Sequence, residues 1–183
     1  MCVHSGTSIV LRRALAYSDG KQDLAISNAN GVGIMLGNGD GSFQLQPTLL
    51  KGRTDFLVAG DFNGDGNPDL AAVGTIPSGA EVSIYLGNGD GTLQPAKNGW
   101  IRDHVSPGGA ATADFNGDGN LDLAVTLGGA FAILLGDGDG GFQPPSFHPG
   151  TGWMPMAVDV DGNGTPDLIF LTPAGIEITL NER

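Results

Sequence analysis

The 183-residue sequence has little of three things that define common protein classes. Its single cysteine, Cys2, excludes an intrachain disulfide framework and a cysteine-based zinc site. Its 8 basic residues are outnumbered by 20 acidic ones, and the net charge of -12 repels nucleic-acid phosphates and anionic lipid surfaces. No apolar run approaches the roughly 18 residues that span a membrane as a helix. We therefore expect neither a nucleic-acid partner nor a membrane span.

The N-terminal residues also lack a secretory signal. The first 13 residues contain no basic region followed by an apolar stretch of about 7 to 15 residues. A cytoplasmic protein, a processed chain and a misassigned start would all share this feature. The compartment must therefore be inferred from the chemistry of the chain.

Glycine and proline are abundant, with 32 and 11 residues, and much of the glycine falls within repeated motifs. Three copies of an acidic motif align without gaps: Asp61–Leu70, Asp114–Leu123 and Asp159–Leu168. A reduced fourth copy ends in Asp19–Leu24, with Leu15 and Tyr17 in place of the first two polar residues. Internal repetition of this kind indicates a repeat architecture.

A second glycine-rich motif alternates with the acidic one. Its copies are Leu36–Phe43, Leu86–Leu93 and Leu135–Phe142. Together the two motifs define four units of about 50 residues. We expect one repeat domain over residues 1–183, with repeats at approximately 1–50, 51–100, 101–147 and 148–183.

The segments around the motifs have the pattern of short strands. Within the second unit we expect strands at Phe56–Gly60, Leu70–Val73 and Glu81–Leu86, separated by turn residues and without helical periodicity. Repeated four-stranded units of this length are typical of β-propellers. The prediction is an all-β fold, a β-propeller of four-stranded antiparallel blades, as a small ring or part of a larger one. A solenoid of stacked sheets is the alternative.

The acidic motif has the pattern of a calcium loop. Oxygen-bearing residues fall at positions 1, 3, 5 and 9, with glycine at 4 and 6, so a coiled loop can turn alternate oxygens toward one point. Ca²⁺ prefers six to eight such hard oxygen ligands. The predicted ligands, with position 7 acting through its carbonyl, are Asp61, Asn63, Asp65, Asn67 and Asp69; Asp114, Asn116, Asp118, Asn120 and Asp122; and Asp159, Asp161, Asn163, Thr165 and Asp167. We expect about three calcium ions per chain.

Other interpretations of these loops are weaker. Asp, Asn and Gly also build ordinary turns, but three copies that keep every ligand position, with three carboxylates each, favour a bound dication. An EF-hand loop needs an acidic residue at position 12, where this chain has Ala72, Val125 and Phe170. Magnesium fits poorly because it demands strict octahedral geometry and retains its waters.

These two alternating motifs resemble the FG-GAP or VCBS-type repeats of integrin α-subunit propellers and many secreted bacterial proteins. The resemblance spans nearly the whole chain. It implies a β-propeller with calcium in the loop that joins two strands of a blade, a location outside the cell or on its surface, and a role in adhesion, carbohydrate binding or scaffolding. This chain departs from the pattern at the Asp19/Asp23 loop, where we expect no calcium, and in showing four units where seven blades are common.

Few other residues suggest chemistry. Asp40, Asp90 and Asp139 are interpreted as hairpin-turn residues. The three histidines, His4, His104 and His148, are far apart and are interpreted as solvated loop residues. Trp100 and Trp153 could stack on a sugar, although large aromatic residues more often pack between blades.

The functional prediction is therefore a non-catalytic, calcium-binding, extracellular repeat module for adhesion or ligand binding, whose partner is an extracellular protein or a glycan. No nucleophile, phosphate-binding or zinc-protease motif occurs. A lectin, the propeller portion of a secreted polysaccharide-degrading enzyme and a structural spacer remain as alternatives.

The last unit is predicted to be one strand short. Glu177–Leu180 aligns with the Val82–Leu86 strand, and no further strand follows it. Because an open sheet edge invites pairing, either residues near Ile9 complete that blade or self-association with another chain does.

Overall fold

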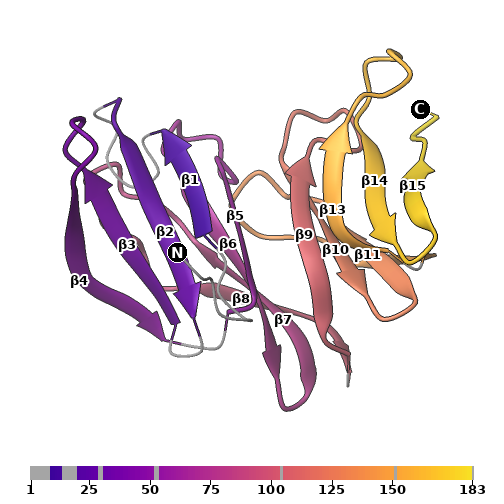
Figure 1. Cartoon of the computed structure of the whole chain (residues 1–183), viewed down its shortest axis with the longest axis horizontal. Coiled ribbons are helices and arrows are strands. Elements are labelled where there is room, and N and C mark those ends of the chain that lie inside the picture. Colours follow the sequence, from indigo (N-terminus) through magenta and orange to yellow (C-terminus); the bar gives the residue numbers. More distant parts are fainter. Residues whose placement is uncertain are drawn as a thin grey trace.

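The computed structural model describes residues 9–13, 20–28, 31–51, 54–103, 105–150 and 152–182. The described residues form 15 β-strands and no helix, arranged as four antiparallel sheets (Figure 1). Within the described part of the chain, therefore, no helix exists that could cross a membrane. The predicted all-β class is confirmed.

Each sheet is made from consecutive strands. The first contains β1 (Ile9–Arg13), β2 (Gln22–Asn28), β3 (Gly31–Gly37) and β4 (Phe43–Lys51). The second contains β5 (Phe56–Gly60), β6 (Asp69–Ile76), β7 (Gly79–Tyr85) and β8 (Lys97–Asp103). The third contains β9 (Pro107–Ala113), β10 (Asp122–Leu127), β11 (Ala130–Leu134) and β12 (Ser146–Pro149). The fourth contains β13 (Trp153–Val158), β14 (Asp167–Thr172) and β15 (Gly175–Thr179).

The strands lie where local chemistry places them. β5 has the predicted bounds, β6 is longer than predicted and β7 is displaced by one or two residues. β6 and β7 share one register, in which Ala71 pairs with Ile84 and Val73 with Val82. Successive side chains of a strand point to opposite faces of the sheet. Because successive residues of the central strand β6 are apolar and buried, both faces of this strand are apolar.

Consecutive sheets pack face to face through three apolar clusters. Leu70 and Tyr85 of the second sheet pack toward Val32 and Ile34 of the first. On its other face, Val73 and Val82 pack toward Leu123 of the third sheet. Phe131 of the third sheet packs against Phe170 of the fourth, with ring centroids 5.1 Å apart and ring planes tilted by 37°. The first strands of successive sheets are also in contact: β1 with β5, β5 with β9, and β9 with β13.

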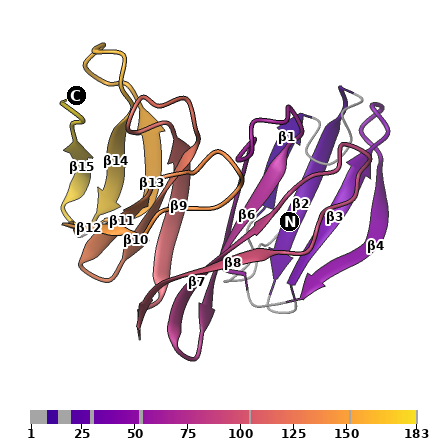
Figure 2. The same ribbon diagram turned by 180° about the vertical axis from the view of Figure 1, so that it is seen from behind.

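The sheets follow one another in a row, with the first sheet at one end and the fourth at the other (Figures 1 and 2). This arrangement corrects one prediction. The Ile9 segment, one of the two predicted ways to complete the last blade, is β1 of the first sheet and pairs with β2, for example Ile9 with Ile26. β1 joins its own repeat because the neighbouring hairpin strand is the nearest free edge.

Candidate functional site

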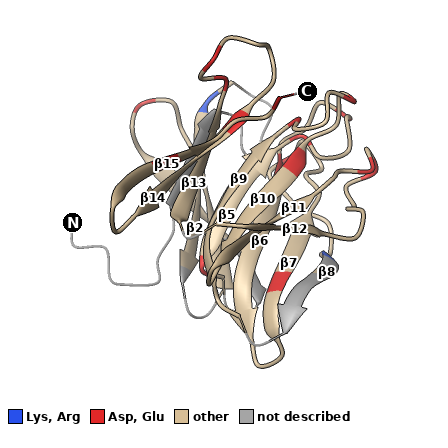
Figure 3. Ribbon diagram, turned by 90° about the vertical axis from the view of Figure 1, so that its right-hand side faces the viewer, with Lys and Arg blue, Asp and Glu red and all other residues tan. Residues whose placement is uncertain are grey.

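The three complete acidic loops join the first and second strands of the second, third and fourth sheets. Most of the acidic residues gather in loops at one end of the sheets (Figure 3). All fifteen predicted ligand residues lie in this group of loops or at the start of the strand that follows.

In the first of these loops, side-chain oxygens turn inward and accept backbone hydrogen bonds. The Asp61 carboxylate accepts from the N–H groups of Asp65, at 3.2 Å, and Gly66, at 2.9 Å. Asp65 Oδ1 accepts from Asn67 N at 2.7 Å, and Asn63 Nδ2 donates to Asp65 Oδ2 at 2.9 Å. Gly66 has φ +83°, a conformation that the predicted tight coil needs and that a β-carbon would penalise.

The second loop repeats this network. Asp114 accepts from Asp118 N at 3.2 Å and Gly119 N at 2.8 Å, and Asp118 accepts from Asn120 N at 2.8 Å. The backbone hydrogen bond from Asn120 lowers the pKa of Asp118, as the one from Asn67 lowers the pKa of Asp65. Both carboxyls are therefore ionised at neutral pH and available to a cation.

The third loop brings its carboxylates closest together. One oxygen each of Asp159, Asp161 and Asp167 lie within 4.8 Å of one another, and no other three acidic, histidine or cysteine side chains of the described residues meet this way. All three loops contain three carboxylates, but the third has its aspartate at position 3 (Asp161) and its asparagine at position 5 (Asn163), the reverse of the other two. This loop has the donor set that a calcium ion prefers.

The aspartate at position 9 has a structural role that the sequence did not suggest. Asp69 is fully buried, and its two carboxylate oxygens accept from Phe62 N at 2.7 Å and Gly87 N at 2.8 Å. One side chain therefore ties the acidic loop to the second glycine-rich motif. The same double hydrogen bond recurs at Asp122, with Phe115 N and Gly136 N, and at Asp167, with Val160 N and Asn181 N. We call this contact the aspartate bracket.

The first sheet shows that the hydrogen bond between the position 9 aspartate and the glycine-rich motif does not depend on a complete acidic loop. Asp23 is buried and accepts from Gly37 N at 2.9 Å, although Leu15 and Tyr17 replace the first two ligands of its repeat. The retention of Asp23 in this reduced copy was the signal available in the sequence. In the second sheet, the residue that donates to the bracket must be glycine, because a β-carbon on Gly87 would lie 2.2 Å from the Pro68 carbonyl oxygen.

Burial affects these bracket aspartates differently. Burial raises the pKa of Asp69 and of Asp122, against the opposing effect of their backbone hydrogen bonds. Backbone hydrogen bonds, first from Asn181 and then from Val160, lower the pKa of Asp167. The fourth sheet has no described sheet beyond it, so its bracket carboxylate is less desolvated.

The second motif contains turn chemistry, as predicted for Asp40 and Asp90. Their carboxylates accept from the backbone N–H groups of Ser42 and Thr92, both at 2.9 Å. In the third copy Asp137 takes this role instead of Asp139, accepting from Gly141 N at 2.8 Å.

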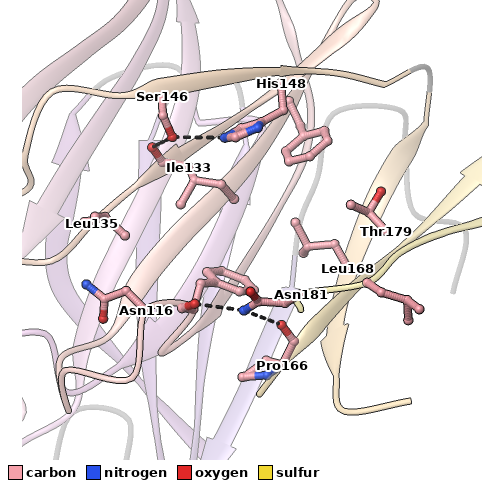
Figure 4. Close-up of a pocket in the computed structure, with 12 residues that line it drawn as sticks. Asn116, Ile133, Leu135, Ser146, His148, Pro166, Leu168, Thr179 and Asn181 are labelled. Carbon is pink, nitrogen blue, oxygen red and sulfur yellow. Dashed lines mark hydrogen bonds between the residues drawn. The ribbon is translucent and has the colours of Figure 1, made fainter. Parts of the chain in front are cut away.

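A cavity of about 500 Å³ lies between the third and fourth sheets (Figure 4). Ser146 and His148 line one side and Asn116 and Asn181 the other, with Leu168 between them. The remaining lining residues are Phe115, Phe131, Ile133, Leu135, Pro166, Thr179 and Leu180. It combines an apolar floor with a few polar groups, as small-ligand sites do.

Aromatic stacking defines the upper wall of this cavity. The His148 ring stacks on Phe131, with centroids 5.1 Å apart and planes 17° from parallel, and its Nε2 lies 3.1 Å from Ser146 Oγ. His148 is exposed as predicted, but it lies on β12 and not in a loop. His4, His104 and the side chain of Trp100 lie outside the described residues.

The expectation for Trp153 was wrong. This side chain is 44% exposed on β13 and does not lie within a core between two sheets. Its backbone pairs with Leu171, which is 43% exposed on the outer face of the sheet, although the Cβ of Trp153 lies beside Gly108 of the third sheet. No described sheet covers that face.

The FG-GAP-like repeat family model matches residues 17–72 and 61–125, which together make up more than half of the sequence. The chain belongs to the FG-GAP-like repeat family. The two matches overlap across the first complete acidic loop; the first match contains the Asp23–Gly37 contact and the second contains the Asp69–Gly87 contact. No curated protein sequence matches this FG-GAP chain.

Two solved structures are similar to this FG-GAP chain. One is an Agrocybe aegerita lectin described as recognising non-reducing terminal N-acetylglucosamine, with 24% identity and a TM-score of 0.64 over 96% of this chain. This chain spans about half of that lectin, 50% of its length, and the likeness shows a shared fold. The other is a Photorhabdus luminescens Tc holotoxin pore, with 21% identity and a TM-score of 0.48 over 95% of this chain and 9% of the pore chain.

Proposed function

We propose that this chain is a non-catalytic, calcium-stabilised module that acts outside the cell and binds glycans in the cavity between its third and fourth sheets. The observation that carries the proposal is that cavity, in which the exposed His148 ring, stacked on the buried Phe131, lies opposite the polar side chains of Asn116 and Asn181. The lectin that shares its fold recognises terminal N-acetylglucosamine, which makes an N-acetyl sugar the first ligand to test.

The chemistry of the cavity suits a sugar. A pyranose ring presents an apolar face that stacks on an aromatic ring and hydroxyl groups that need hydrogen-bond partners. The His148 ring offers a stacking surface, and the hydroxyls of Ser146 and Thr179 line the same cavity. An acetamido methyl group would find the apolar floor formed by Leu168 and Ile133.

The propeller arrangement is part of the proposal. Successive contacts between β1, β5, β9 and β13 place the first strand of every sheet next to that of its neighbour. Sheets whose first strands lie next to one another and whose faces pack together have the arrangement of propeller blades. We propose that the four sheets are blades around one axis.

Calcium is proposed at the three complete loops. Their ionised carboxylates repel one another, and a dication would relieve that repulsion. Open loops of this kind bind calcium at roughly 0.1 to 1 mM, which matches extracellular concentrations and leaves such sites empty in the cytosol. This affinity range is the basis for the extracellular location.

Calorimetric titration with N-acetylglucosamine and with a glycan that ends in it tests the proposed function. We expect millimolar to high-micromolar binding to the calcium-loaded protein, lost in His148→Ala. The matched control is Phe147→Ala: Phe147 is the adjacent β12 residue, 45% exposed, and its side chain alternates to the other face. Binding that survives in His148→Ala, or no binding by the wild type to a broad glycan array, would refute the glycan proposal.

Native mass spectrometry and melting curves test the calcium proposal separately. We expect three ions per chain. With about 2 mM Ca²⁺ and a dissociation constant near 0.1 mM, each site adds about 1.8 kcal/mol, so chelation should lower the melting temperature by roughly 10 to 20 °C. Four ions, or a melting temperature unchanged by EDTA, would show that these loops have another role.

A further inference from the structure

The fourth sheet has an apolar face that no described residue covers. On its outer side Ile169 pairs with Ile178, and Leu171 with Ile176. Leu171, Ile176 and Ile178 are 43%, 70% and 47% exposed. We call these four residues the trailing face.

The same positions in the second sheet are buried by the sheet that follows. There Ala71 pairs with Ile84 and Val73 with Val82, in the same register relative to the bracket aspartate. These four side chains are 0%, 2%, 0% and 1% exposed, and they pack with Leu123 and Val125 of the third sheet. The trailing face is therefore the kind of surface that receives another sheet.

Position 2 of the acidic loop shows the same contrast between the covered second sheet and the uncovered fourth sheet. Phe62 is 3% exposed: its ring packs edge-on against Phe142 at 5.9 Å, and its carbonyl accepts from Gly140 N at 3.1 Å. Both partners belong to the second motif of the next sheet. The equivalent residue of the last loop, Val160, is 47% exposed.

The first sheet carries the complementary surface. Leu24 and Ile26 alternate with the buried Ala25, and Leu24 pairs with Met35. The equivalent residues of the second sheet, Leu70, Ala72 and Tyr85, are 1%, 4% and 9% exposed because they pack on the preceding sheet. We call Leu24, Ile26 and Met35 the leading face; all three are only partly buried.

We propose that the trailing face of the fourth sheet docks onto the leading face of a second copy of this chain, head to tail. Each copy carries both halves of the sheet–sheet interface that already occurs three times inside it. In this contact Phe43 of the second copy packs on Val160 as Phe142 packs on Phe62, and Gly41 N of the second copy donates to the Val160 carbonyl.

The comparison of lengths supports a second copy as the occupant. The lectin that shares the fold is about twice as long as this chain, which covers 50% of it. One further copy supplies about the same amount of chain, and head-to-tail interfaces form a ring when the rotation between copies closes. The proposal does not depend on calcium or glycan binding.

Light scattering on size-exclusion fractions of the full chain gives the first test. We expect a species of twice the 18.6 kDa chain mass at concentrations up to about 0.1 mM. Ile176→Lys on the trailing face and Met35→Lys on the leading face should each weaken association by about 100-fold, because each would bury an unpaired charge. Gln94→Lys, at an exposed loop position on neither face, is the matched control and should not change association.

Mixing the two variants gives the decisive test. Each alone lacks one face and should be monomeric, but the mixture retains one intact trailing face and one intact leading face. We expect the mixture to form a heterodimer, which also shows that both variants are folded. A wild type that stays monomeric, a Met35→Lys variant that dimerises normally, or a mixture that stays monomeric would each overturn the proposal; a monomeric wild type would mean that another sheet or a different protein occupies the face.

Discussion

The second and fourth sheets show how one repeat pattern produces two environments. Both carry an acidic loop, an aspartate bracket and two apolar faces in matching register. In the second sheet Val82 is 1% exposed, whereas its counterpart Ile176 is 70% exposed. The repeat sequence specifies a sheet that is apolar on both sides, and the number of neighbouring sheets decides whether both sides are buried.

The electrostatic environments differ for the same reason. The bracket carboxylates of the second and fourth sheets make equivalent hydrogen bonds, but burial raises the pKa of Asp69 while hydrogen bonds lower the pKa of Asp167. Both side chains are fully buried, but the hydrogen bonds of Asp69 are buried and those of Asp167 only partly buried, because no described sheet covers the fourth one. The exposure of the apolar side chains and the pKa of the bracket aspartate therefore differ between the two sheets for the same reason.

The largest expected contrast is between Val82→Lys and Ile176→Lys. Placing an ammonium group in the core between the second and third sheets should lower the free energy of unfolding by about 4 kcal/mol or more. The same change at exposed Ile176 should cost less than about 1 kcal/mol. Urea denaturation at low protein concentration measures both. Equal losses would mean that the outer face of the fourth sheet is as important to the monomer as the interior.

A smaller contrast is expected when the bracket is removed. Asp69→Ala leaves the N–H groups of Phe62 and Gly87 without their acceptor in a buried site and should cost about 3 kcal/mol. Asp167→Ala should cost about half as much, because water can reach the partner groups at the uncovered sheet. Unfolding in EDTA separates this effect from calcium. If Asp167→Ala were the more damaging change, solvent access would not explain the difference.

The sequence predicted what local chemistry determines. Strand positions such as Phe56–Gly60 and the left-handed Gly66 follow from turn residues a few positions apart. The bracket joins Asp69 to Gly87, 18 residues away, and depends on a close approach to the Pro68 carbonyl that no local pattern shows.

The environment of Trp153 could not be predicted for a related reason. Apolar alternation shows which residues share a face, but it does not show whether another sheet covers that face. Trp153 was expected within a core and is 44% exposed because its sheet lies at the end of the row. The cavity beside His148 likewise depends on how the third and fourth sheets meet.

The three acidic loops, as proposed calcium sites, offer an expected contrast of about 1.8 kcal/mol per site. We expect Asp65→Ala in the second sheet and Asp161→Ala in the fourth each to remove about one third of the EDTA-sensitive stabilisation, and Asp19→Ala to remove none. Because the three carboxylates of the last loop already lie within 4.8 Å of one another, we expect this loop to bind calcium most tightly, and Asp161→Asn, which leaves it two carboxylates, to weaken its affinity. Calcium titration followed by melting temperature tests this order. A tighter site in the first complete loop would contradict it.

The smallest effect is the pH dependence of the two bracket carboxyls. Asp167 has a pKa below its ordinary value of 3.8, so it contributes stability above that pH that is lost as the pH falls through its folded-state pKa. Asp69 has a pKa above 3.8, so its ionised form destabilises the folded state, and that destabilisation disappears as the pH falls toward 3.8.

The measurement is the difference in unfolding free energy between wild type and each Asp→Asn variant, in EDTA from about pH 3 to 7. Any loss of stability that does not depend on pH leaves the slope of this difference unchanged, so the slope reports the titration of the one carboxyl. We expect the difference to shrink with acid for Asp167→Asn and to grow with acid for Asp69→Asn. Slopes of the same sign would show that the two carboxyls share one environment, contrary to the contrast between a covered and an uncovered sheet.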